Sequence, residues 1–156
     1  VLVIDAAPPP PPRLAAIGSA STLAIELSDG QQKLVVNCGG PGRLGGGLPE
    51  GLAEALRTTA AHSTLTLADT NSTAILADGS LGKGVGEVPV ERSEDNDASR
   101  LEASHDGYVR GFGLLHSRAL SLGNDGKEVR GLDRLAQQGR RRIREDVPFA
   151  IRFHLA

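Results

Sequence analysis

Histidines are the side chains of this chain best suited to acid–base or metal chemistry near neutral pH. There are four, His62, His105, His116 and His154, and none belongs to a His-x-His or His-x-x-x-His pair. Because a structural zinc site needs four closely spaced Cys or His ligands, the single cysteine and the scattered histidines exclude such a cluster. A lone histidine in a strand is more often a hydrogen-bonded polar residue than a ligand. Spacing alone therefore assigns no role to these histidines.

A basic run, "GRRRIRED", gathers Arg140, Arg141, Arg142 and Arg144 near the C-terminus. Guanidinium groups bind sulfate, carboxylate or phosphate bidentately. An acidic polysaccharide is therefore a candidate partner, with Arg140, Arg141 and Arg142 as the substrate-binding candidates. The alternative is a solvated loop, partly neutralised by the two acidic residues that follow. The net charge of −2 gives no general argument for nucleic acid or a membrane surface.

Glycines spaced as Gly40-x-Gly42-x-x-Gly45 follow the strand-like "KLVVNC", which is the outline of a dinucleotide-binding unit. That reading requires a parallel sheet and a helix that starts at Gly45. The next strand-like segment alternates in polarity, whereas covered parallel strands read as continuous apolar runs. A phosphate-binding P-loop is excluded too, because Gly84 stands in "GSLGKG" where a Ser or Thr must hold magnesium.

The chain has 156 residues, so we expect one domain with one core. Three Phe, one Tyr and no Trp leave Leu, Val, Ile and Ala to build it, and the single Cys38 excludes an internal disulfide. No apolar run is long enough to span a bilayer, and no signal peptide is visible. Because Val1 begins in mid-pattern and Ala156 follows a strand-like segment, we expect a piece of a longer protein. The five prolines at residues 8–12 predict a polyproline connector.

Alternating segments predict an antiparallel β-fold. "STLAIELSDGQQKLVVNC" predicts a hairpin that turns at Asp29-Gly30, with Ile25 opposite Leu34. A short helix is expected near residues 49–58, and Leu65 and Leu67 alternate with polar residues in the next strand. Further strands are expected at "VLVID", "TAILA", "VGEVPVER", "SRLEASHDGYV", "FGLLHSRALSL" and "PFAIRFHLA". Together these predict a mainly β protein, an antiparallel β-sandwich with one short helix.

Three segments carry a resemblance to a known family: "LAIEL" (23–27), "LVVNCG" (34–39) and "AHST" (61–64). In this order, and with "LEASHDGYV" after them, they resemble the C-terminal β-domain of heparinase II/III-like polysaccharide lyases. The resemblance runs from about Ala20 to Ala156. It implies a supersandwich-like domain that follows a helical toroid in the same chain.

The reaction implied by the resemblance is β-elimination at a uronic acid of an acidic polysaccharide. A base removes the C5 proton while the carboxylate is neutralised, and a Tyr or His protonates the leaving oxygen. The 156 residues alone are expected to be inactive, since the helical part supplies most of the cleft. The resemblance also implies that the protein is located in the periplasm or cell envelope. The alternative is a non-catalytic carbohydrate-binding or structural sandwich.

The family's metal is held by two histidines and an Asp, and this sequence departs from that pattern. Ile17 and Ser19 stand where a His-x-His stretch would fall, and Asn37 replaces the Asp. His62 remains, so His62 and Asn37 are candidate ligands of a degenerate divalent-metal site, with no cofactor certain. For His62 the equal alternative is a structural hydrogen bond to the turn at residues 69–71.

Tyr108, in "SHDGY", is the only tyrosine and therefore the catalytic candidate that the resemblance implies. The alternative is that Tyr108 has only a structural role at the edge of the core.

Overall fold

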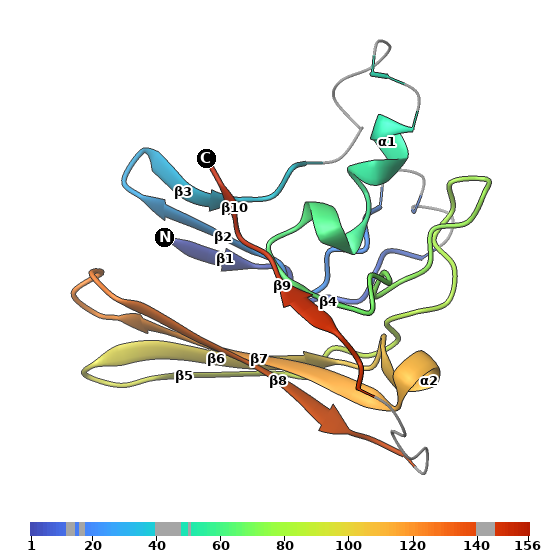
Figure 1. The fold of residues 1–156 in the computed structure, drawn as a ribbon. Coiled ribbons are helices and arrows are strands. Elements are labelled where there is room, and N and C mark those ends of the chain that lie inside the picture. The colour runs from blue at the N-terminus through green and yellow to red at the C-terminus, as the bar shows by residue number, and fades with distance from the viewer. Residues whose placement is uncertain (12–14, 16–17, 40–47, 50, 140–145) are drawn as a thin grey trace.

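The computed structural model describes residues 1–11, 15, 18–39, 48–49, 51–139 and 146–156, which form two stacked layers of strands (Figure 1). One layer is a sheet of order β1-β2-β3-β10, and the other has the order β5-β6-β7-β8. A third, two-stranded sheet joins β4 to β9. The strands are β1 (Leu2–Ile4), β2 (Ile25–Asp29), β3 (Gln32–Val36), β4 (Leu65–Leu67), β5 (Val90–Glu94), β6 (Ala98–His105), β7 (Leu114–Gly123), β8 (Val129–Gln137), β9 (Phe149–Ile151) and β10 (His154–Leu155).

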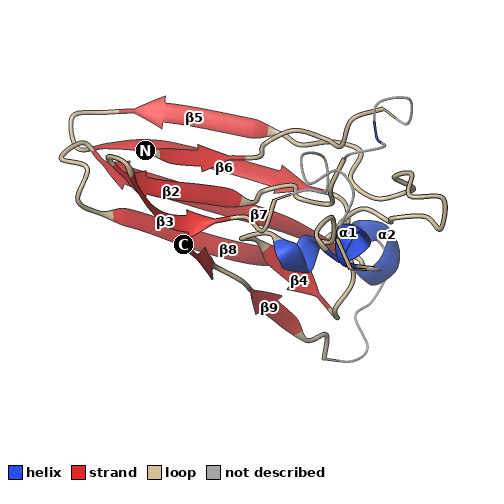
Figure 2. Cartoon of the chain, turned by 90° about the horizontal axis from the view of Figure 1, so that it is seen from above, coloured by secondary structure: helices blue, strands red, loops and turns tan. Residues whose placement is uncertain are grey.

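The expectation of a mainly β, antiparallel, sandwich-like protein is confirmed. Every strand pair among the described residues is antiparallel. Seen from above, the strands of the two four-stranded sheets run in similar directions, as in aligned sheet packing (Figure 2). The parallel sheet that a dinucleotide site requires is not found in the described part of the chain, and residues 40–47 lie outside it.

Helical structure is short. The helix expected near residues 49–58 is α1 (Leu52–Ala55), followed by a 3₁₀ turn, η3 (Thr59–Ala61). A second helix, α2 (Val109–Phe112), lies where one expected strand ends, at Val109, and the next begins, at Phe112. The strand ends instead at His105, and Asp106 and Gly107 lead into the helix. No helix in the described ranges is long and apolar enough to cross a membrane.

The hairpin of β2 and β3 is present, but the predicted register is wrong. Gly30, at φ 55°, takes the first central position of a two-residue turn, so Asp29 pairs with Gln32. Leu27 then pairs with Val35 and Ser28 with Lys33, which leaves Leu34 as the extra residue of a β-bulge. The register therefore depends on the turn and the bulge together.

Strand β8 was missed, and "TAILA" (73–77) forms only an isolated bridge at Ile75. On β8 the positions that face the other layer include Gly131 and Asp133, so the strand lacks the apolar alternation that marks a half-buried strand. The expected C-terminal strand is divided into β9 and β10, which join different sheets.

The apolar core is small and lies where β4, α2 and β7 meet. Leu65, Leu67, Tyr108 and Leu114 form its buried cluster, with Phe112 packed against it. Between the layers the chain also buries polar side chains, above all His105, His116 and Arg118, each at most 1% exposed. Such burial costs free energy unless every polar atom is bonded. No buried side-chain nitrogen or oxygen of the described residues lacks a hydrogen bond.

Of the polyproline segment, residues 8–11 are described and belong to no helix or strand; Pro12 lies outside the described residues. The role of this segment as a stiff connector stays a prediction.

Candidate functional site

His62 lies just after η3 and is only 5% exposed. Its Nδ1 is 2.7 Å from the carbonyl oxygen of Thr58. Because a carbonyl only accepts, Nδ1 carries the proton and Nε2 keeps its lone pair. Burial lowers the pKa of His62 below its ordinary value of 6.5, more than the Thr58 bond raises it, so the ring is neutral at pH 7. The structural hydrogen bond exists, but its partner is Thr58 and not the turn at residues 69–71.

Asn37 lies beside His62, just after β3. Its Oδ1 accepts a hydrogen bond from the backbone N–H of Ser63 at 2.8 Å, and its Nδ2 donates to Glu26 Oε1 at 3.2 Å. Since Ser63 is the residue after His62, the fold brings together the two residues that the sequence proposed as a pair. The amide of Asn37 holds the backbone on which His62 is mounted.

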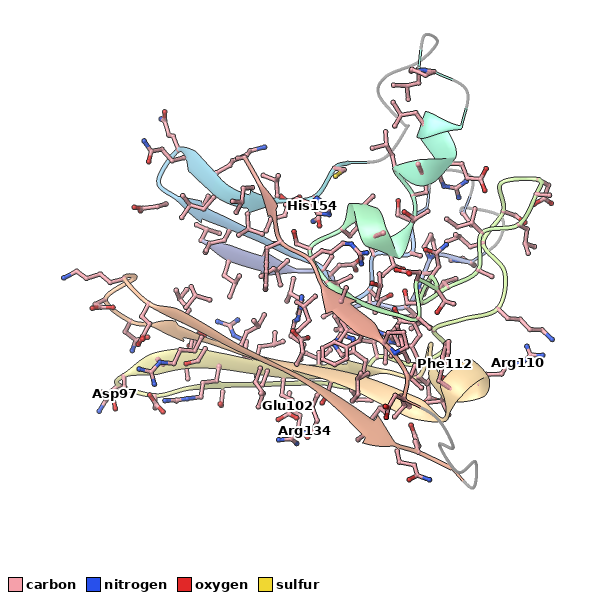
Figure 3. All side chains as sticks on the ribbon, viewed as in Figure 1. Asp97, Glu102, Arg110, Phe112, Arg134 and His154 are labelled. Atoms are coloured by element: carbon pink, nitrogen blue, oxygen red, sulfur yellow. The ribbon has the colours of Figure 1, made fainter. Side chains whose placement is uncertain are left out.

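His154, on β10, completes this corner from the far end of the chain (Figure 3). Its Nε2 donates to the carbonyl of Ala60 at 3.0 Å, so its Nδ1 faces Cys38 Sγ, 3.5 Å away, with a lone pair. The backbone N–H of His154 donates to Ser63 Oγ at 3.0 Å. We call His62, Asn37, Cys38, Ser63 and His154 the His62 corner.

The His62 corner does not offer the ligands of a tight metal site. Among the described residues no group of three His, Cys, Asp or Glu side chains is placed to hold a metal ion. The amide oxygen of Asn37 is already used by Ser63, and Ser19 stands where the resemblance expects a histidine. Because a zinc site needs at least three good protein ligands, we derive no metal chemistry from this donor set.

A second polar cluster lies between the layers. His105 on β6 is directly opposite His116 on β7. The N–H of Gly107 donates to His105 Nδ1 at 3.2 Å, so His105 donates from Nε2 to His116 Nδ1 at 3.1 Å. His116 in turn donates from Nε2 to Asp133 Oδ1 at 2.7 Å. The hydrogen bonds therefore run in one direction, from His105 through His116 to Asp133.

Arg118 joins that cluster to the other layer. It forms a bidentate pair with Asp133, from Nε to Oδ1 at 2.8 Å and from Nη2 to Oδ2 at 2.9 Å. Its Nη1 donates to the carbonyls of Leu23, at 2.7 Å, and Ser63, at 2.9 Å. Leu23 has φ 63°, a left-handed conformation uncommon for leucine, which this buried bond helps to hold.

These contacts set the ionisation of the cluster. Burial raises the pKa of Asp133, but the hydrogen bonds from His116 and Arg118 outweigh it, and the pKa falls below its ordinary value. Burial, with the nearby His116, lowers the pKa of His105 to about 3. The result is a buried carboxylate–guanidinium pair close to a neutral His105.

Tyr108 lies in the core, 1% exposed, and its hydroxyl donates to the carbonyl of Leu65 at 2.9 Å. Its ring is 5.3 Å from that of His105 and 6.4 Å from that of Phe112, between centroids. Burial raises the pKa of its phenol, so the hydroxyl stays protonated. Arg140, Arg141 and Arg142 lie outside the described residues.

Sequence reasoning missed His154, Cys38 and the cluster of His105, His116, Arg118 and Asp133. The pairing of His105 with His116 follows only from the β6–β7 register, which no turn motif announces because α2 stands between the strands. His154 reaches the corner only because β10 pairs with β3.

One comparison with known proteins gives a match. A family model described as "Heparinase II/III-like, C-terminal" covers residues 1–156. No curated protein and no solved structure matches the chain. The match spans the whole chain, and the antiparallel sandwich-like fold agrees with the expectation drawn from "LAIEL", "LVVNCG" and "AHST". The chain therefore belongs to the heparinase II/III-like C-terminal domain family.

Proposed function

We propose that this domain is the carbohydrate-contacting, non-catalytic part of a lyase that cleaves uronate-containing acidic polysaccharide by β-elimination. The base and the acid come, in this proposal, from a helical domain of the same longer protein. The proposed location is the periplasm or cell envelope. Family membership supports the polysaccharide-lyase context.

The observation that carries the proposal is the contrast between His62 and Tyr108. His62 is neutral and held in one tautomer by Thr58, so its Nε2 is an acceptor suited to a sugar hydroxyl. Tyr108 is in the core and donates to Leu65, so it is not placed to protonate a leaving oxygen. β-Elimination needs a base and an acid at one sugar. At the His62 corner the ring N–H of His62 is already bonded to Thr58 and that of His154 to Ala60, so neither is placed to donate to a leaving oxygen.

A second candidate is a binding or structural domain in a protein without lyase activity. The bond between Asn37 and Ser63 favours it, because the residue at the metal-ligand position serves here to hold the backbone. The two candidate functions make different predictions for a longer protein that contains this domain. Only the first predicts that such a protein forms unsaturated uronate.

The test is polysaccharide binding by the 156-residue chain, measured by calorimetry with polygalacturonate, alginate and heparin. His62→Ala is expected to weaken binding about tenfold, which corresponds to about 1.4 kcal/mol. Lys33→Ala is the matched control, on the exposed part of β3 away from the corner, and should leave the affinity nearly unchanged. Equal affinities for both variants and the unaltered chain would remove the His62 corner from the proposal.

A further inference from the structure

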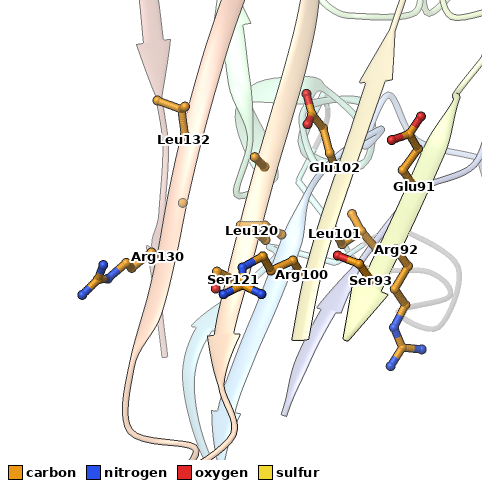
Figure 4. Close-up of a pocket in the computed structure, with 12 residues that line it drawn as sticks. Glu91, Arg92, Ser93, Arg100, Leu101, Glu102, Leu120, Ser121, Arg130 and Leu132 are labelled. Carbon is orange, nitrogen blue, oxygen red and sulfur yellow. The ribbon is translucent and has the colours of Figure 1, made fainter. Parts of the chain in front are cut away.

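The outer face of the β5–β8 sheet carries a depression of about 430 Å³ (Figure 4). The strand register arranges its outward side chains in two rows. Each row crosses the four strands through residues that pair with one another. The first row is Glu91, Glu102, Ala119 and Leu132, and the second is Ser93, Arg100, Ser121 and Arg130. We call these eight residues the outer groove.

Alternation along the strands shows that the outer groove faces away from the other layer. Arg118 and Asp133 point between the layers, so Ala119 and Leu132, one residue away on the same strands, point outward. Glu102 also points away from the β1–β3 layer (Figure 3). The groove is hollow because Ala119 and Ser121, on the central strand β7, are short, while longer side chains flank them on β6 and β8.

The charges of the outer groove cancel, two guanidinium groups against two carboxylates. Arg100 forms an ion pair with Asp95, and Arg130 pairs with Glu128 at 3.0 Å, so both arginines are held toward the turns. Each still has further N–H donors, since a guanidinium carries five.

Glu91 and Glu102 are directly opposite each other on β5 and β6. Within the described part of the chain neither carboxylate has a hydrogen bond or an ion pair. Like charges opposite each other in a sheet are destabilising. The groove therefore offers two acceptor-only groups beside a row of donors about 7 Å away along the strands.

We propose that the outer groove binds a neutral, hydroxyl-rich oligosaccharide. Sugar hydroxyls both donate and accept, so they can donate to Glu91 and Glu102 and accept from Arg100. Leu132, which is 56% exposed, and Ala119 supply an apolar surface for the C–H face of a sugar ring. Because the two carboxylates and the two arginines cancel, the groove has no net attraction for an acidic chain or for a cation, so the balance of charge favours a neutral ligand.

This inference is independent of the proposed function, because the outer groove and the His62 corner lie on different layers. The test is calorimetric titration of the 156-residue chain with cellohexaose, xylohexaose and maltohexaose. An oligogalacturonate, calcium chloride and a lysine-rich peptide serve as the acidic and cationic probes. At least one neutral hexasaccharide is expected to bind, while the charged probes do not bind at the groove.

Ala119→Arg fills the floor and is expected to weaken binding of the neutral sugar at least about tenfold. Ser117→Arg is the matched control, because it places the same side chain on the same face of β7 but outside the groove, and it should change the affinity less than about twofold. Glu102→Gln should weaken binding without lowering the melting temperature of the fold, because it removes one of two opposed like charges.

Three results would overturn the inference. The first is binding of none of the neutral hexasaccharides. The second is equal weakening by Ala119→Arg and Ser117→Arg. The third is binding of calcium, the lysine-rich peptide or the oligogalacturonate that Ala119→Arg abolishes. The proposed function fails separately, because binding of an acidic polysaccharide at the His62 corner is weakened by His62→Ala and not by Ala119→Arg.

Discussion

Arg118 donates from Nη1 to the carbonyl of Ser63 at 2.9 Å, and Asn37 accepts from the N–H of the same residue. The residue that follows His62 is thus held from both sides, by a buried charged group of β7 and by an amide beside β3. The buried polar cluster of His105, His116, Arg118 and Asp133 and the His62 corner are therefore both bonded to this one peptide segment. The stability of the sandwich and the placement of His62 are therefore coupled.

Arg118→Met is expected to destabilise the domain by about 3–5 kcal/mol, because it leaves Asp133 charged, buried and without its bidentate partner. Urea unfolding followed by circular dichroism measures the change. Arg130→Met is the control, since the Arg130–Glu128 pair is exposed and its loss should cost no more than about 1 kcal/mol. Comparable losses in the two variants would show that the buried network does not hold the layers together.

Acidification should destabilise the domain well above the range in which carboxylates titrate. The pKa of His105 is lowered to about 3 in the folded chain from an ordinary 6.5. Between these values the unfolded chain binds a proton at His105 that the folded chain does not, so stability is complete above 6.5 and falls as the pH drops toward 3. The pKa of Asp133 is also lowered, so its contribution is present above 3.8 and is lost as the pH falls through its folded value.

The measurement is a set of urea unfolding curves between pH 7.5 and 4. One proton gives a slope of about 1.4 kcal/mol per pH unit. His105→Gln keeps a donor for His116 and removes the titration, so its slope should be flatter by about that amount. An unchanged slope would contradict the neutral state assigned to His105.

Tyr108→Phe is expected to cost about 1–3 kcal/mol of stability, because the buried carbonyl of Leu65 loses its donor. In the longer lyase of the proposed function, kcat on polyuronate should stay within about twofold of its value without the substitution, a change of less than about 0.5 kcal/mol in the activation barrier. Thermal melting and initial rates measure the two effects. A fall in kcat of a hundredfold or more with an unaltered melting temperature would make Tyr108 the catalytic residue that the resemblance implied.

Gly84→Ala should destabilise the fold by about 1–3 kcal/mol or more, since an added Cβ would lie 2.3 Å from Thr73 Cα and 2.6 Å from Ser72 O. Gly111→Ala is the matched control, because its added Cβ would meet nothing within 4 Å. Equal melting temperatures for the two variants would contradict the close backbone approach at Gly84.

Asn37→Asp combined with Ser19→His tests whether the degenerate metal site can be restored. The account predicts zinc binding too weak to measure by calorimetry, because the oxygen of residue 37 is bonded to the backbone N–H of Ser63 and the ring of His62 is held by Thr58, so the side chains at positions 19, 37 and 62 are not free to converge on one ion. The single Ser19→His variant is the control for adventitious binding. Zinc binding that requires both changes would establish the ancestral ligand set at these positions.

Local sequence patterns predicted the elements whose structure depends on neighbouring residues, such as turns and helix starts. Gly30 announced the β2–β3 hairpin, because a tight turn needs its positive φ, and Pro49 marked the approach to α1. The bulge at Leu34 was beyond such signals, since nothing in "QQKLVVN" distinguishes an extra residue from a paired one. Strand β8 was missed because it carries Asp133, and sequence patterns place a charged residue at the surface unless its ion-pair partner is known. That partner, Arg118, lies on another strand.

The residues of the candidate site also divide into those that the sequence predicted and those that only the fold brings together. His62 and Asn37 were named from the family-like segments, and their closeness follows from the fold around β3. His154 and the histidines 105 and 116 could not be placed from spacing, because their neighbours come from strands distant in sequence.

The most direct test of the proposed role is formation of unsaturated uronate by the isolated 156-residue chain. The chain is incubated with polygalacturonate, alginate and heparin, and the ultraviolet absorbance of the product is followed. The account predicts no product, while the same preparation binds at least one of these polymers in a way that His62→Ala weakens. Product that accumulates with time and disappears in His62→Ala or Tyr108→Phe would contradict it and would make this domain a catalyst in its own right.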